Sequence, residues 1–150
     1  MSTLIAYFSV SGTTARVARQ LADGNDLLEI KPKQKYTNAD VNWRNKSSRS
    51  SIEMNDPNAR PELADTSADL SQYDTICVGF PIWWYTAPRI INTFLESYDL
   101  AGKRIILFAT SGGSGINSAV RDLRDHYPNL NIVGGRLLNG RVTPDILSSL

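Results

Sequence analysis

Residues 4–14 read LIAYFSVSGTT, and this stretch decides the fold. The apolar run over residues 4–8 predicts a buried strand, because short continuous apolar runs are typical of parallel sheets. The small polar residues that follow predict a loop. Ala15, Ala18 and Ala22 then recur at the spacing of one helix face. A strand, a short polar loop and a helix in this order are the first half of a βαβ unit.

The same alternation continues along the chain. Four more strands are predicted by short apolar runs, at residues 27–30, 75–80, 104–109 and 131–133. Two further helices are predicted by apolar residues at helical spacing, at residues 89–98 and 116–127. Alternating strands and helices form a parallel sheet with helices on both faces. We therefore expect an α/β three-layer sandwich whose five-stranded parallel sheet has the order 2-1-3-4-5.

The whole chain, residues 1–150, is expected to form one domain. Its length fits a single domain of ordinary size, and no internal repeat is present. Residues 31–70 are the least regular part, with the polar run KSSRSS at residues 46–51 and prolines at positions 57 and 61. We expect this part to be a long surface excursion, partly helical, because it is too polar to form a second domain.

Charge and hydropathy exclude several classes of function. The chain has 16 Lys and Arg residues against 15 Asp and Glu, so its net charge of +1 predicts no binding to nucleic acid or to an anionic membrane. No apolar run approaches the roughly 20 residues of a membrane-spanning helix. The N-terminal residues carry no basic leader or cleavage site, and we expect a cytoplasmic protein.

Cys77 is the single cysteine of the chain. One cysteine excludes an internal disulfide, a Cys-x-x-Cys redox pair and a cysteine-ligated iron–sulfur cluster. Its place within an apolar run predicts a buried side chain rather than a reactive thiolate. Redox chemistry would therefore come from a bound cofactor. We assign no catalytic side chain and no metal ligand.

The loop after the first strand is suited to phosphate. Its hydroxyl side chains and exposed N–H groups lie at a helix N-terminus, where the helix dipole favours an anion. A glycine within it permits close approach of the backbone. Taken alone, the loop could also be an ordinary Ser/Thr helix cap after a turn. The candidate phosphate-binding residues are Ser9, Val10, Ser11, Gly12, Thr13 and Thr14.

The loop after the third strand reads PIWWYTAP over residues 81–88, with three consecutive aromatic residues. Adjacent residues of an extended chain point to opposite sides, so Trp83 and Trp84 cannot both lie in the core. At least one indole should face a ligand or solvent. The alternative is that one tryptophan packs on its own helix. The candidate ligand-binding residues are Pro81, Ile82, Trp83 and Trp84.

The loop after the fourth strand reads TSGGSG over residues 110–115. It offers backbone donors beside small side chains, against which the edge of a ring could lie. It could also be a flexible connector, and it lacks the closing glycine of a hydrolase nucleophile elbow. The candidate residues are Thr110, Ser111, Gly112 and Gly113.

The joint placement of these three loops is more specific than any one of them. Each follows a strand, and the first, third and fourth strands are neighbours in the expected order. A sheet of this order binds its ligand at the switch point between the first and third strands. Phosphate donors, aromatic side chains and a glycine-rich loop would then surround one crevice. FMN has the three parts that such a crevice would bind.

On these motifs the chain resembles the flavodoxin family over nearly its whole length. Residues 9–14 are similar to the phosphate loop of that family. Residues 81–84 with Pro88, and residues 110–113, resemble its two ring-binding loops, in a version shared with FMN-dependent quinone reductases. The resemblance implies a flavodoxin-like fold of the short-chain form. It also implies that FMN is held by residues 9–14 at its phosphate and by residues 81–84 and 110–113 at its ring.

Three departures from this pattern bear on function. Electron-carrier flavodoxins are usually strongly acidic, whereas this chain is nearly neutral. Trp84 stands where many flavodoxins have a glycine, and Ser118 and Arg124 stand where related quinone reductases have Tyr and His. We expect an FMN electron-transfer protein. The alternatives are an NAD(P)H-dependent FMN oxidoreductase with a quinone, nitro or azo acceptor, and a flavin-binding module without turnover. The expected partner is a redox protein or NAD(P)H, and the chain is expected to be a monomer or homodimer.

Overall fold

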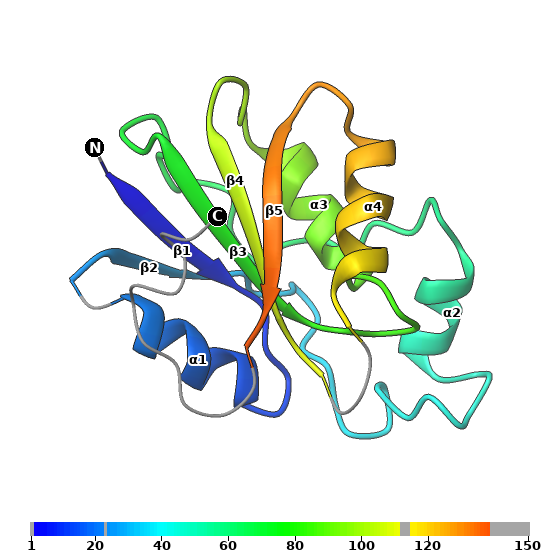
Figure 1. Ribbon diagram of the computed structural model, residues 1–150. Coiled ribbons are helices and arrows are strands. Elements are labelled where there is room, and N and C mark those ends of the chain that lie inside the picture. The colour runs from blue at the N-terminus through cyan, green and yellow to red at the C-terminus, as the bar shows by residue number, and fades with distance from the viewer. Residues whose placement is uncertain (1, 23, 112–114, 139–150) are drawn as a thin grey trace.

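A computed structural model describes residues 2–22, 24–111 and 115–138. Its centre is a parallel sheet of five strands, shown in Figure 1. The strands are β1 (Thr3–Tyr7), β2 (Asp26–Glu29), β3 (Thr75–Pro81), β4 (Arg104–Thr110) and β5 (Asn131–Leu137). They lie in the order β2-β1-β3-β4-β5, which confirms the predicted sheet.

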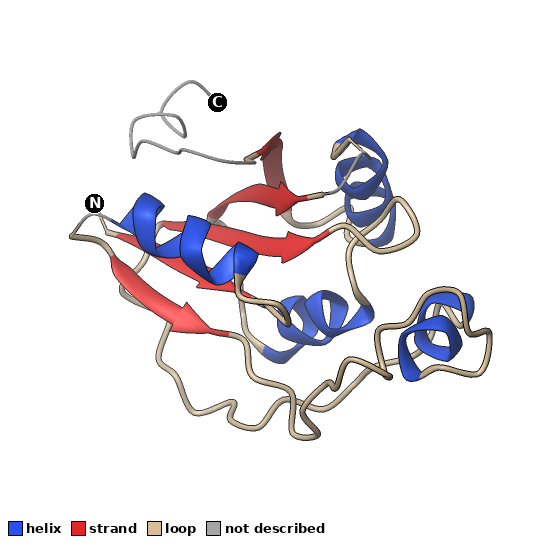
Figure 2. Cartoon of the chain, turned by 90° about the horizontal axis from the view of Figure 1, so that it is seen from below, coloured by secondary structure: helices blue, strands red, loops and turns tan. Residues whose placement is uncertain are grey.

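Helices cover both faces of this sheet (Figures 1 and 2). The helices are α1 (Thr13–Ala22), α2 (Arg49–Asn55), α3 (Arg89–Ser97) and α4 (Asn117–His126). Ile5 and Cys77 pack with α1 on one face, whereas Leu4 and Ile76 pack with α3 and α4 on the other. This alternation produces the predicted three layers. None of the helices in the described parts of the chain is long and apolar enough to cross a membrane.

The middle of the sheet is packed so closely that one position requires glycine. Gly79 of β3 is the register partner of Phe108 of β4. A Cβ atom on Gly79 would come within 2.1 Å of the Phe108 ring.

Cys77 on the same strand is buried, as predicted, and burial raises the pKa of its thiol to about 12.

The carboxyl ends of β1, β3 and β4 lie at one edge of the sheet. Tyr7 is paired with Gly79, which in turn is paired with Phe108. Beyond Tyr7, the N–H of Phe8 donates to the carbonyl of Gly79 at 2.9 Å. The loops that follow these three strands therefore begin next to one another.

The segment between β2 and β3 is partly helical, as predicted, but it is packed more closely than a surface excursion. Tyr36 and Met54 within it are buried. The polar run at residues 46–51 begins α2, and the Ser48 side chain accepts the N–H of Ser51 at 3.4 Å. These short hydroxyl side chains are buried because they bond to one another and to the backbone of the helix start. In Figure 1, α2 lies on the outer side of α3 and α4.

Candidate functional site

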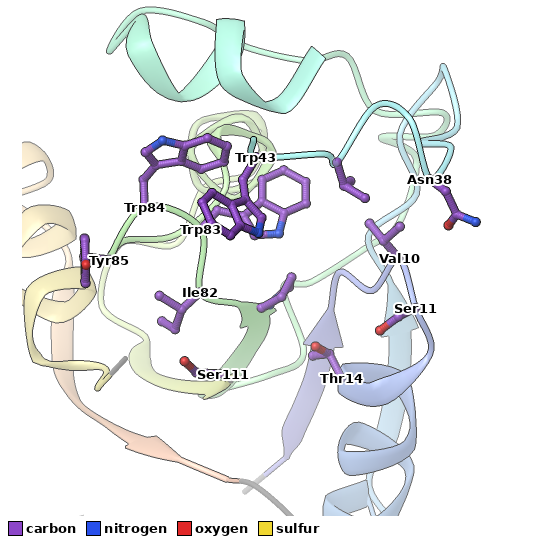
Figure 3. Close-up of a pocket in the computed structure, with 12 residues that line it drawn as sticks. Val10, Ser11, Thr14, Asn38, Trp43, Ile82, Trp83, Trp84, Tyr85 and Ser111 are labelled. Carbon is purple, nitrogen blue, oxygen red and sulfur yellow. The ribbon is translucent and has the colours of Figure 1, made fainter. Parts of the chain in front are cut away.

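The loops after β1, β3 and β4 border one cavity of about 740 Å³ (Figure 3). Its volume is in the range of small-molecule and cofactor sites. It lies at the point where the strand order reverses between β1 and β3, which is where sheets of this kind bind ligands. The cavity is lined by Val10, Ser11, Thr14, Asn38, Val41, Trp43, Pro81, Ile82, Trp83, Trp84, Tyr85 and Ser111.

One end of the cavity is formed by residues 9–14, which we call the hydroxyl loop. Gly12 has a φ of 96°, in the left-handed region that favours glycine. Its carbonyl accepts the N–H of Arg16 at 3.0 Å and so closes the first turn of α1. The Ser9 hydroxyl accepts the N–H of Gly12 at 3.1 Å, which holds the loop in a tight turn. The loop thus gathers hydroxyl groups at a helix N-terminus, where an anion is favoured.

The residues predicted in this loop have two different places. The ones that line the cavity are Val10, Ser11 and Thr14. The others shape the loop without lining the cavity, and they are Ser9, Gly12 and Thr13. Thr13 remains close to the lining, because its hydroxyl oxygen lies 3.3 Å from that of Ser11.

Thr14 connects two of the predicted loops. Its hydroxyl oxygen lies 2.8 Å from the hydroxyl oxygen of Thr110, and both side chains are buried. This bond joins the start of α1 to the end of β4. Thr110 is not among the described residues that line the cavity, so its part in the site is to hold Thr14. Ser111, the next residue, does line the cavity.

The other end of the cavity is formed by a tight aromatic turn over residues 83–86. The N–H of Trp83 donates to the carbonyl of Thr86 at 2.9 Å, and the N–H of Thr86 donates back at 3.0 Å. The two residues between them, Trp84 and Tyr85, have φ values of 48° and 64°. Hairpin turns of this shape usually contain Asn and Gly, because other residues are strained at positive φ. Two large aromatic residues at the cavity therefore have an unfavourable backbone conformation.

Both tryptophans of this turn line the cavity. Trp83 is half-buried against the core, whereas Trp84 is 38% exposed. The expectation that they do not both lie in the core therefore agrees with the structure. The indole of Trp83 also packs edge-on against the buried ring of Phe8, with centroids 5.7 Å apart. Pro81 and Ile82 line the cavity as well.

A wall of the cavity that the sequence analysis missed comes from the segment between β2 and β3. Asn38, Val41 and Trp43 of this segment line the cavity. Trp43 is 65% exposed, and the Arg44 guanidinium lies 5.1 Å from the centroid of its ring. All three tryptophans of the chain thus line one cavity. The available signal was a single large aromatic residue within a polar stretch. In Figure 3 the three indoles gather at one end, away from Ser11 and Thr14.

The described lining of the cavity contains no acidic or basic side chain. Its polar side-chain groups are hydroxyls, the amide of Asn38 and the indole N–H groups of the three tryptophans. A phosphate group would therefore be bound by neutral donors and the dipole of α1 rather than by an ion pair. Gly112 and Gly113, which were predicted to lie along a ring, are outside the described residues.

The strand order and the converging loops both point to one family, and a sequence model described as flavodoxin matches residues 2–150. This chain belongs to the flavodoxin family. The match covers almost the whole chain, so both the predicted family and the flavodoxin-like fold are confirmed.

Solved structures show how far the similarity extends. A candidate flavoprotein from Bacteroides uniformis is 51% identical, with a TM-score of 0.93 over 99% of this chain and 96% of that one. A candidate flavoprotein from Bacteroides eggerthii is 49% identical, with a TM-score of 0.94 over 99% and 94%. A flavoprotein from Lactobacillus acidophilus in complex with FMN is 25% identical, with a TM-score of 0.73 over 91% and 92%. None of the curated proteins matches this flavodoxin.

Proposed function

We propose that this flavodoxin binds FMN in the cavity and acts in electron transfer. The observation that carries the proposal is the presence, in one uncharged cavity, of a hydroxyl-rich helix N-terminus and three indole side chains. FMN has a phosphate at one end and a planar ring at the other, so each end of the cavity matches one end of FMN. The Lactobacillus acidophilus flavoprotein is in complex with FMN. When bound, FMN supplies a ring that accepts and releases electrons.

At the phosphate end, the chain contributes neutral hydrogen-bond donors. Ser11 lines the cavity beside the first turn of α1, whose N–H groups have no partner within the helix. The dipole of α1 adds about 0.3 to 2 kcal/mol to the binding of an anion. The hydrogen bond between Thr14 and Thr110 keeps the start of the helix in place, where it would face the anion.

At the ring end, the chain contributes apolar surface. Ile82, Trp83 and Trp84 would exclude water from one side of a planar ring and gain contact area against it. Excluding water also strengthens the hydrogen bonds made at the edge of the ring. The arrangement of these side chains would therefore influence how readily the ring takes up electrons.

A second function is favoured by the open aromatic rim of the cavity. Trp43 is 65% exposed and Tyr85 is 71% exposed. The net charge of +1 provides no strong field to attract a charged protein. An exposed aromatic rim instead offers a stacking surface to a planar quinone, nitro or azo compound. The alternative function is an NAD(P)H-dependent FMN oxidoreductase.

Stepwise anaerobic reduction of the FMN-reconstituted and desalted protein separates these functions. For electron transfer we expect retained flavin absorption and a long-wavelength band at half reduction. Bleaching without that band, together with NADPH oxidation by the purified protein and a quinone alone, would favour the oxidoreductase. Loss of all flavin on desalting would contradict both functions.

The phosphate assignment has its own test in Thr13→Trp. Thr13 is exposed, so the larger side chain should leave the fold intact while blocking the hydroxyl loop. Losing one hydrogen bond to a charged group lowers affinity by about 10- to 100-fold, and we expect the dissociation constant of FMN to rise by that factor. Gln20→Trp, at an exposed position further along α1, is the matched control. Equal affinities for the two variants would refute the assignment.

A further inference from the structure

Trp83 belongs to a cluster of three rings that we call the aromatic triad, formed by Phe8, Tyr36 and Trp83. Each pair meets edge to face. The ring centroids are 5.5 Å apart for Phe8 and Tyr36, 5.7 Å for Phe8 and Trp83, and 5.5 Å for Tyr36 and Trp83. Phe8 and Tyr36 are buried, whereas Trp83 reaches the cavity. The indole that lines the site is therefore held from behind by two buried rings.

Two members of the triad are fixed by the backbone of the sheet edge. The N–H of Phe8 donates to Gly79, and both hydrogen bonds of the aromatic turn fix Trp83. Tyr36 is different, because it comes from the segment between β2 and β3. Side-chain contacts hold its ring behind Trp83.

Those contacts come from α2. The Tyr36 hydroxyl donates to the Glu53 carboxylate, and the Arg49 guanidinium lies over the Tyr36 ring, 3.7 Å from its centroid. Arg49 Nε also pairs with Glu53 at 3.0 Å, and both side chains are largely buried. Arg49 further donates to the carbonyl of Gln34 at 2.6 Å. The ring of Tyr36 is thus held at its hydroxyl, at its face and through its neighbouring backbone.

The helix that supplies these contacts is itself tied to the main body of the protein. Arg89, the first residue of α3, donates to the carbonyl of Met54 at 2.9 Å and to that of Glu53 at 3.3 Å. These two carbonyls lie in the last turn of α2, and that of Glu53 also accepts the C-cap N–H of Asp56 at 3.2 Å. A continuous set of contacts therefore runs from α3 through α2 and Tyr36 to the indole at the cavity.

We propose that Tyr36, held by Glu53 and Arg49 of α2, is a positioning residue that sets the orientation of the Trp83 indole toward the flavin ring. This inference rests on the proposed function, since it assumes that the ring of FMN lies against Trp83. It assigns a role to the segment between β2 and β3 in tuning the flavin. Tyr36 acts through Trp83, because Tyr36 is not among the described residues that line the cavity.

The first test uses the protein without FMN, so that it does not depend on the proposed function. In a Trp43→Phe/Trp84→Phe background, Trp83 is the only tryptophan. Its near-ultraviolet circular dichroism band then reports how firmly the indole is held. We expect Tyr36→Leu to reduce this band by about half or more, because the indole loses one of its two ring partners. Tyr36→Phe retains the ring but not the bond to Glu53, so it should produce a smaller loss in the same direction.

Tyr98→Leu is the matched control. Tyr98 is a partly buried tyrosine whose ring packs on Phe94, with centroids 5.3 Å apart, and it does not line the cavity. Its replacement should leave the Trp83 band unchanged. A Trp83 band in Tyr36→Leu as strong as in the parent would overturn the proposal. An equal loss in Tyr98→Leu would also overturn it, because the effect would then be general loosening of the core.

The second test uses the protein loaded with FMN and all its tryptophans. We expect Tyr36→Leu to raise the dissociation constant of FMN by about 2- to 12-fold, the factor that corresponds to the loss of one aromatic pair. We also expect it to shift the midpoint potential of the flavin. Glu53→Gln, made in the chain that keeps Tyr36, retains an acceptor for the Tyr36 hydroxyl and should leave the potential close to that of the parent. An unchanged potential in Tyr36→Leu would contradict the positioning role. Absence of FMN binding in the parent itself would instead refute the proposed function and leave the first test valid.

Discussion

The two ends of the cavity differ in how much of the chain each one requires. The hydroxyl loop consists of six consecutive residues, and its bond from Gly12 to Ser9 lies within the loop. The aromatic end needs the turn after β3, Trp43 from the segment between β2 and β3, and Tyr36 behind Trp83. Its segments are separated by tens of residues and meet only in the folded protein.

This difference predicts a difference in sensitivity. A site made from one contiguous loop depends on local hydrogen bonds and on the helix that follows it. A site assembled from distant segments depends on the packing of each segment. Changes at Tyr36 or Trp43 should therefore alter the ring end of the cavity and leave the hydroxyl loop unchanged.

The largest effect on stability is expected at the centre of the sheet, which supports both ends of the cavity. Gly79→Ala would place a Cβ atom within 2.1 Å of the Phe108 ring. We expect the free energy of unfolding to fall by about 3 kcal/mol, at the upper part of the usual range for overpacking. Urea unfolding measures this change. Phe108→Leu in the same chain should recover part of the loss, and no recovery would mean that the collision is not its cause.

The next largest effect is expected at the buried pair of hydroxyl groups on Thr14 and Thr110. Thr14→Val leaves the Thr110 hydroxyl buried without its partner. We expect a loss of about 1 to 3 kcal/mol in the free energy of unfolding, again measured in urea. In the double variant Thr14→Val/Thr110→Val both polar groups are absent, and most of the stability should return. A double variant as unstable as the sum of two single losses would show that the hydroxyls are not paired.

A smaller effect of opposite sign is expected at the aromatic turn. Tyr85 has a φ of 64° and is 71% exposed, so Tyr85→Gly relieves backbone strain and removes little buried surface. After the greater flexibility of glycine in the unfolded chain is subtracted, we expect a gain of about 0.5 kcal/mol. Thermal unfolding of the protein without FMN measures it. Trp43→Gly is the control, because Trp43 is exposed but has no positive φ, and it should show no gain.

The smallest effect is expected from pH. Burial, together with the hydrogen bond to Glu53, raises the pKa of Tyr36 above its ordinary value of 10. Above pH 10 the unfolded chain loses this proton while the folded chain keeps it, so the stability that Tyr36 adds declines as pH rises. The difference in free energy of unfolding between the parent and Tyr36→Phe should be constant below pH 10 and shrink above it. A difference that stays constant above pH 10 would show that the pKa of Tyr36 is not raised in the folded protein, and hence that Glu53 does not hold the phenol.

The sheet and the hydroxyl loop could be predicted because their signals are contiguous. Each strand has its own apolar run, and the hydroxyl side chains of residues 9–14 are close together in the sequence itself. The predicted Pro81, Ile82, Trp83 and Trp84 also reach the cavity, since they follow directly from β3. The predicted ring contacts of Gly112 and Gly113 remain predictions.

The wall between β2 and β3 could not be predicted for a physical reason. Tyr36 and Trp43 are isolated aromatic residues in a polar stretch, where no periodicity indicates which face is buried. Three serines of this polar run, Ser48, Ser50 and Ser51, are buried and hydrogen-bonded to one another, and composition alone cannot reveal such pairing. The left-handed conformation of Trp84 and Tyr85 opposes their own preferences, so it is imposed by the turn that encloses them.

The absence of ionised side chains from the described cavity lining has a consequence for the protein as a whole. The chain alone has a formal net charge of +1 at neutral pH. A phosphate monoester adds about −1.5 to −2 charges, and no side chain of that lining is available to cancel them. Loading FMN would therefore reverse the sign of the net charge. The empty and loaded forms should separate on an ion-exchange column, and a charged partner could distinguish them at long range.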